Sequence, residues 1–212
     1  EGQATGSEMA GLTPYFAVGV EHILLGIDHL LFVLGLLLLL QLVNTGWRTL
    51  LGTITAFTIA HSITLSLALL AGVSLPSAPV EIVIALSILL LATEIVRHPQ
   101  RLKKSLPPTL TASKPWLVAF GFGLLHGFGF AGALAEIGVP EDAAAWALLL
   151  FNLGVEFGQL LFVAAVLLLL FVISQLPKAA WLTPLAQAVM VYSIGGLAVF
   201  WVLERGLPLL QI

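Results

Sequence analysis

Long apolar stretches follow one another along almost the whole chain, with short polar segments between them. A helix needs roughly 20 apolar residues to cross the hydrocarbon core of a bilayer, so the pattern predicts an all-α fold, a polytopic transmembrane bundle of about six helices. The polar stretch over 98–115, HPQRLKKSLPPTLTASKP, is expected to form a loop, because prolines and charges stop a helix. A polar extracytoplasmic segment (1–14) and one transmembrane domain (15–212) are predicted, with spans at about 15–43, 47–73, 80–96, 116–137, 144–176 and 184–203.

The composition of the chain indicates a lipid environment. Of its 212 residues, 59% are hydrophobic and 9% charged, whereas soluble domains carry about a quarter of charged residues. The lipid bilayer is therefore the expected partner of most of the surface. The net charge of −3 indicates no nucleic-acid partner. The chain has no cysteine, so a bound metal ion would be held by nitrogen and oxygen ligands.

The positive charges are distributed unequally between the two sides of the predicted bundle. Seven of the eight Lys and Arg residues lie after the first, third or fifth span, and only Arg205 follows the last span. Lys and Arg are enriched in cytoplasmic loops, so both termini are expected on the outer, periplasmic side. The sequence thus predicts a multi-pass protein of the bacterial inner (cytoplasmic) membrane, and this orientation would suit a cleaved signal peptide upstream.

Ionisable side chains lie inside several predicted spans, where each costs several kcal/mol unless it has a partner or a function. One histidine in each of the first, second and fourth spans, and one glutamate in the fifth, fall near mid-span. Imidazole and carboxylate groups from four helices at one depth predict a metal site. The candidate ligands are His22, Asp28, His29, His61, His126 and Glu156, with Glu81, Asn152, Gln159, Thr58 and Ser62 as supporting polar residues.

Helical spacing gives the first-span residues separate roles. His22 and His29 are seven residues apart, so in a continuous helix they share a face and lie roughly 10 Å apart along the axis. Two stations along one pathway are the expected arrangement, unless Gly26 lets the helix bend or unwind. Asp28 is about 100° round the helix from His29, so it can face a neighbouring helix or orient the imidazole of another histidine.

The fourth span is rich in glycine on both sides of its histidine. Gly123, Gly127 and Gly129 are expected to let another helix approach closely beside His126. A site shared between helices requires that kind of packing.

The segment EHILLGIDHLLF contains a histidine, five further residues and then Asp-His, namely His22, Asp28 and His29. This pattern resembles the HupE/UreJ family of membrane proteins, in particular its second subfamily. The segments TAFTIAHSITL, VEIVIALSI, GLLHGFGFA and FNLGVEFGQ are also similar to that family. The resemblance implies uptake of nickel, or of cobalt, associated with hydrogenase and urease maturation, with His22, Asp28 and His29 as the first-span metal residues.

Three functions remain open from the sequence. The favoured one is a permease for a divalent transition metal (nickel, zinc or cobalt), since imidazole with carboxylate suits these ions. The second is an intramembrane zinc hydrolase acting on a lipid or membrane peptide, with three histidines around the metal and Glu156 or Asp28 as general base. Phe130, where nickel permeases are expected to carry a further histidine, modestly favours the hydrolase. In the third, the polar groups satisfy one another without any ion. A homo-oligomer is also open, because about six spans enclose a pathway with difficulty.

Overall fold

The computed structural model is all-α, which confirms the predicted fold class. It describes residues 2–137, 143–175 and 179–210, and the side chains of 13–129, 143–175 and 184–209. The elements are α1 (Gly2–Leu25), α2 (Ile27–Leu42), α3 (Trp47–Ala71), α4 (Ser77–Lys103), the short α5 (Leu110–Ser113), α6 (Pro115–Ile137), α7 (Ala144–Ser174), α8 (Ala179–Gly206) and the 3-10 turn η2 (Leu207–Leu210).

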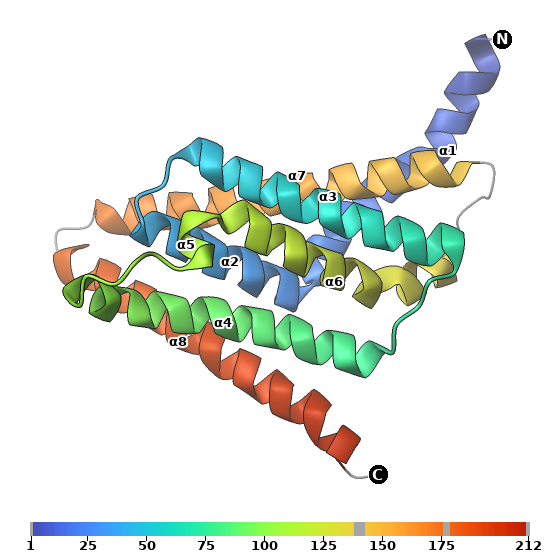
Figure 1. The fold of residues 1–212 in the computed structure, drawn as a ribbon. Coiled ribbons are helices and arrows are strands. Elements are labelled where there is room, and N and C mark those ends of the chain that lie inside the picture. Colours follow the sequence, from blue (N-terminus) through green and yellow to red (C-terminus); the bar gives the residue numbers. More distant parts are fainter. Residues whose placement is uncertain (1, 138–142, 176–178, 211–212) are drawn as a thin grey trace.

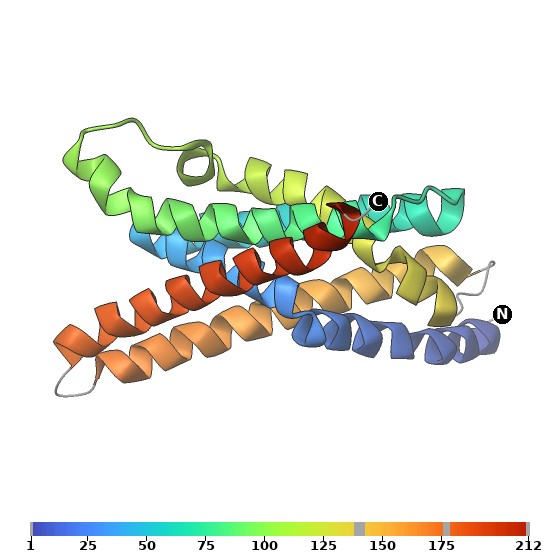
Figure 2. The same ribbon diagram turned by 90° about the horizontal axis from the view of Figure 1, so that it is seen from below.

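Helix α2 lies at the centre of the bundle. Nearly every residue from Phe32 to Leu40 is buried, as expected for a helix that is apolar on all sides. Around it, α3 packs against α6, α1 against α7 and α4 against α8 (Figures 1 and 2). The largest apolar cluster joins α2, α4 and α8 through Phe32, Leu91 and Ile194, among others. The centre of the bundle is therefore a packed apolar core.

The outward faces of α7 and α8 are also apolar. Leu168, Phe171 and Tyr192 have 63%, 60% and 70% of their surface exposed. An exposed apolar surface of this extent is typical of a lipid-facing bundle.

The number of membrane-spanning helices falls slightly below the predicted six among the described residues. Four segments are long and apolar enough to cross a bilayer, and the bent pair α1–α2 makes a fifth if it counts as one span. The part of α6 whose side chains are described, Pro115–Gly129, is a shorter apolar helix. A sixth span formed by all of α6 stays a prediction. The four full spans are Trp47–Ala71, Ser77–Lys103, Ala144–Ser174 and Pro184–Leu209.

Two predicted polar segments contain helix. Helix α4 continues through Pro99 to Lys103, so the prediction of a loop over all of 98–115 was wrong. A proline removes one backbone hydrogen bond, and α4 tolerates that loss in its last turns. The chain leaves the helix at Ser105, whose φ of 50° is incompatible with a right-handed helix. The short helix α5 follows, capped by the Thr109 hydroxyl, which accepts a hydrogen bond from the Ala112 N–H.

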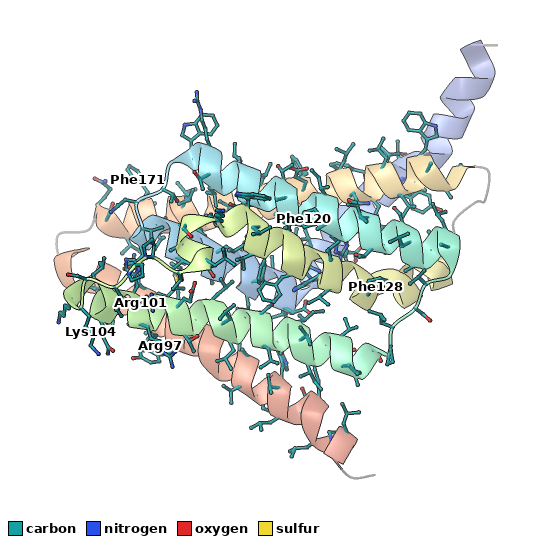
Figure 3. The ribbon with its side chains drawn as sticks, viewed as in Figure 1. Arg97, Arg101, Lys104, Phe120, Phe128 and Phe171 are labelled. Atoms are coloured by element: carbon teal, nitrogen blue, oxygen red, sulfur yellow. The ribbon has the colours of Figure 1, made fainter. Side chains whose placement is uncertain are left out.

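The N-terminal polar segment is helical as well. Helix α1 begins at Gly2, and its first turns project beyond the rest of the bundle (Figure 1). Both chain ends lie toward one end of the bundle (Figures 1 and 2), and Arg97, Arg101 and Lys104 lie toward the other (Figure 3). This separation matches the charge asymmetry in the sequence, while the orientation in the membrane stays a prediction.

Candidate metal centre

The first predicted span is broken at Gly26. The axes of Thr13–Leu25 and Ile27–Leu42 meet at 71°, and Gly26 has φ of −74° and ψ of 88°, outside the helical region. Glycine weakens a helix interior by about 1 kcal/mol relative to alanine. At this position it also provides space, because a Cβ on Gly26 would lie 2.8 Å from Nδ1 of His29 and 2.9 Å from the carbonyl oxygen of His22. The break therefore needs a residue without a side chain.

The break brings His22 and His29 together. Their ring centroids lie 4.8 Å apart, about half of the axial separation that a continuous helix would give. The prediction of two separate stations was therefore wrong, and the exception allowed for Gly26 applies. Bending at Gly26 changes the direction of the chain between the two histidines, so that the two side chains meet.

Two further histidines, from α3 and α6, complete a cluster around His29. The ring centroids of His61 and His126 lie 5.8 Å and 4.7 Å from that of His29, and His22 lies 5.9 Å from His61. His29, His61 and His126 are 5%, 0% and 1% exposed. The expectation that these three imidazoles meet inside the bundle is thus confirmed, and His22 joins them. This group of four is called the histidine cluster below.

Close packing of α3 against α6 positions two members of the cluster. A Cβ on Gly123 would lie 2.5 Å from the carbonyl oxygen of Phe57, and one on Gly127 would overlap the Thr64 hydroxyl and the carbonyl oxygen of His61. The prediction that glycines allow a close helix approach beside His126 is confirmed at these two positions. Gly129 differs, since its Cβ would meet only side-chain atoms of α4, the nearest at 3.4 Å.

Asp28 orients His29. Its Oδ1 accepts a hydrogen bond from the backbone N–H of His29 and lies 2.9 Å from Nδ1 of the same residue. The sequence left open whether Asp28 faces a neighbouring helix or orients the imidazole of another histidine, and its carboxylate folds back over the first turn of α2 onto the adjacent His29. There it also interacts favourably with the positive end of the helix dipole. With Nδ1 engaged, Nε2 of His29 is the nitrogen left for a ligand.

Aromatic side chains enclose the cluster. The ring of Phe57 lies 5.1–6.2 Å from those of His29, His61 and His126. Phe32 contacts His126 at 5.4 Å and Phe151 contacts His22 at 5.5 Å. Sequence reasoning missed these three residues, because a phenylalanine in an apolar span carries no signal of its neighbours.

Several buried imidazole nitrogens have no hydrogen-bond partner among the described residues. They are Nε2 of His29 and both ring nitrogens of His61 and His126. An unsatisfied buried polar group costs about 1–3 kcal/mol, so a partner that bonded to these nitrogens would stabilise the bundle. Within the described part of the chain, however, no three ligand side chains already surround one ion position. The rings would have to turn for several nitrogens to face a common point.

A cavity of about 590 Å³ adjoins the cluster. Its lining includes His22, His29 and His126 together with four charged residues, Glu21, Asp28, Glu81 and Arg205. Because Glu21 is exposed, the cavity connects the cluster to the surface. Glu81, a predicted supporting residue, lines this cavity, and so does Arg205, for which the sequence analysis inferred no role beyond orientation in the membrane.

Three further predicted residues, Glu156, Thr58 and Gln159, bond across the contact between α3 and α7. Glu156 accepts a hydrogen bond of 2.6 Å from the Thr55 hydroxyl, and Thr55 precedes His61 by six residues, roughly 9 Å along the helix. The structure therefore does not bring Glu156 to the histidine cluster, and the hydrolase base predicted there is separated from it. The Thr58 hydroxyl donates to Oε1 of Gln159 at 3.1 Å.

Two other supporting residues bond to backbone within their own helices. The Ser62 hydroxyl donates to the carbonyl oxygen of Thr58, and Nδ2 of Asn152 donates to that of Leu148. The side chain of Phe130 lies outside the described residues.

The fold and the site together define a multi-pass α-helical membrane protein with a histidine cluster inside its bundle. The profile of the HupE / UreJ protein family matches residues 1–205. The chain therefore belongs to the HupE/UreJ family, which is linked to nickel and cobalt uptake, as the sequence motifs predicted. No curated protein and no solved structure matches the chain.

Proposed function

We propose that this protein is a permease for a divalent transition metal, nickel or cobalt, in the bacterial inner membrane. The histidine cluster binds the transported ion, and Asp28 holds His29 in the orientation for binding. One observation carries the proposal: four imidazoles from α1, α2, α3 and α6 lie with neighbouring centroids 4.7–5.9 Å apart.

The spacing of the rings suits a shared ion. Imidazole binds such metals at a distance of about 2.0–2.1 Å from nitrogen, so two imidazoles on one ion have ring centroids about 5 Å apart. The four measured separations lie on both sides of that value. Convergence of their nitrogens on one point requires the rings to turn about their side-chain bonds. Imidazole nitrogen favours nickel, cobalt, zinc and copper over magnesium and calcium.

The broken span supports transport over a purely structural metal site. In membrane transporters, interrupted helices occur where the backbone lines a binding site, and the carbonyl end of a half-helix favours a cation. Here the carboxyl end of α1 stops at Leu25, directly beside the cluster. Arrangements of this kind bind an ion without holding it irreversibly, because a few residues at the break can change conformation.

Metal binding by the full chain in lipid nanodiscs tests the proposal. Titration with Co²⁺ is expected to give a d–d absorption spectrum with nitrogen ligands at a stoichiometry of one ion per chain. His29→Ala and His126→Ala are expected to weaken binding by at least tenfold. His98→Ala is the matched control, since His98 lies near the far end of α4 and should leave binding unchanged.

Transport is measured separately, in proteoliposomes that enclose a metal-sensitive dye. Wild-type protein is expected to admit Ni²⁺ or Co²⁺ faster than empty liposomes, and the His29→Ala variant is not. A protein that binds Co²⁺ but does not transport it would support the metal site and refute the permease function.

A second function is favoured by one specific feature, the convergence of the histidines on one place beside a cavity of about 590 Å³. Three imidazoles around one zinc ion with an open position would suit an intramembrane hydrolase. Release of fatty acid or of a cleaved peptide by Zn²⁺-loaded protein, lost in His29→Ala, would favour this function over transport. Because Glu156 lies away from the cluster, Asp28 is the remaining acid predicted as its base.

A further inference from the structure

An ion pair joins α4 to α8 in the wall of the cavity. Nε of Arg205 lies 3.2 Å from Oε2 of Glu81, and its Nη1 donates a hydrogen bond of 3.1 Å to the backbone carbonyl of the same residue. The guanidinium also lies over the ring of Trp201, 5.2 Å from its centroid. Arg205 is therefore held at the cavity by a carboxylate, a carbonyl and an aromatic face.

The pair shares its cavity with the histidine cluster. Glu81 and Arg205 line the same space as His29 and His126, whose unpartnered nitrogens are buried. The Glu81 side chain is 43% exposed and that of Arg205 is 21% exposed, so the pair lies on the surface side of the buried imidazoles. A cation that enters the cavity beside this pair would meet Glu81 before the imidazoles.

The charged residues of the cavity wall are mostly acidic, whereas basic residues gather elsewhere in the bundle. Glu21, Asp28 and Glu81 supply three carboxylates, and Arg205 supplies the one Lys or Arg side chain in the described lining. Arg97 and Arg101 of α4 and the nearby Lys104 lie toward the far end of the bundle (Figure 3). Arg205 is thus the one internal cation at a site whose other charged groups attract cations.

We infer that the guanidinium of Arg205 occupies Glu81 in place of a bound cation, and that an incoming divalent metal ion must displace it. The inference rests on the proposed function and adds Arg205 as a residue that determines specificity for divalent over monovalent cations. A divalent ion gains twice the Coulomb energy of a monovalent ion at the same distance from a carboxylate. Arg205 therefore competes effectively with Na⁺ and K⁺ for Glu81 and poorly with Ni²⁺ or Co²⁺. Once displaced, the guanidinium keeps its contact with Trp201, and the ion moves on to the imidazoles.

A purely structural ion pair predicts a different pattern of mutational effects. If the pair only fastened α4 to α8, removing either partner would weaken the bundle, and metal affinity would fall in both variants or in neither. Displacement predicts opposite signs. Arg205→Gln removes the competitor and leaves Glu81 free, whereas Glu81→Gln leaves an uncompensated guanidinium that repels cations.

The experiment measures Ni²⁺ binding to the full chain in nanodiscs by isothermal titration calorimetry, at low and at high NaCl. Arg205→Gln is expected to raise the affinity about tenfold at low NaCl and to make it more sensitive to NaCl, and Glu81→Gln to lower it about tenfold. Arg205→Lys, which cannot bond the carboxylate and the carbonyl with one planar group, is expected to shift affinity in the same direction as Arg205→Gln by a smaller factor.

Arg97→Gln is the control, because Arg97 is exposed and lies toward the opposite end of α4 (Figure 3). Thermal unfolding in the same nanodiscs identifies variants that fail to fold. If Arg205→Gln is among them, Arg205→Lys decides whether loss of the Arg205 contacts raises or lowers the Ni²⁺ affinity. Equal losses of affinity in the Arg205 and Glu81 variants, with wild-type binding intact, would overturn the displacement and leave the proposed function standing. Wild-type protein that binds no Ni²⁺ would overturn both.

Discussion

The imidazole rings of His22 and His29 lie with centroids 4.8 Å apart, although the two residues belong to two different helices that meet at 71°. Gly26 separates these helices and has His29 Nδ1 directly against it. The geometry of the metal centre therefore depends on a residue that has no side chain to offer a ligand.

Gly26→Ala is expected to weaken Co²⁺ binding at least tenfold, because the added methyl group would meet His29 Nδ1 and the carbonyl oxygen of His22. The histidine ring would have to move away from its neighbours. Spectral titration in nanodiscs measures the effect. Gly52→Ala is the matched control, since a Cβ there meets nothing within 4 Å. Equal affinity for the Gly26 variant and wild type would contradict the role of the break.

Asp28→Asn is expected to lower metal affinity about 10- to 100-fold, the usual effect of losing a carboxylate that orients a histidine ligand. The amide keeps the size of the side chain but not the charge that holds the His29 Nδ1–H. Equilibrium dialysis with ⁶³Ni²⁺ gives the affinity. Glu204→Gln, a charge loss at an exposed position of α8, serves for comparison and should have no effect.

Gly127→Ala is expected to destabilise the protein by about 1–3 kcal/mol, the usual cost of overpacking. The methyl group would overlap the Thr64 hydroxyl and the backbone of α3. Gly121→Ala, in the same helix but with open space around its Cβ, should be neutral or slightly stabilising. Thermal unfolding of the two variants side by side decides this, and similar midpoints would refute the close packing of α3 on α6.

Metal affinity is expected to fall as the pH is lowered from 7.5 to 5.5. Imidazole binds a metal ion only in its neutral form, so protons compete with the ion and are released when it binds. Calorimetry in two buffers of different ionisation enthalpy counts the released protons. Binding with no proton release and no loss of affinity at low pH would contradict competition between protons and the metal ion in this pH range. The His98→Ala variant should follow the wild-type curve.

Glu156→Gln is expected to change Co²⁺ affinity by less than about twofold, because its carboxylate bonds to Thr55, which lies six residues, or roughly 9 Å, along α3 from His61. The amide can still accept the hydroxyl proton. A tenfold loss of affinity would return Glu156 to the ligand set that the sequence predicted. Spectral titration with Co²⁺ measures the affinity, and His29→Ala serves as the reference for the loss of a ligand.

The sequence by itself determined the class of fold, most of the helices and the family. Hydropathy is a local property, so the stretches that form α3, α4, α7 and α8 could be read from consecutive residues. The motif around His22, Asp28 and His29 is local too, and it pointed to the family that the profile confirms. Glycines beside His126 predicted a close helix neighbour, although not which helix it would be.

Only the tertiary structure decided which polar groups meet. Depth along each span placed Glu156 and His126 at similar levels, but level does not fix which way a helix is turned or which helix lies beside it. The bend at Gly26 moved His22 to His29, the carboxylate of Asp28 turned back onto its own neighbour, and α8 brought Arg205 to Glu81. Each of these contacts depends on the packing of helices distant in sequence, or on a backbone break whose angle that packing sets.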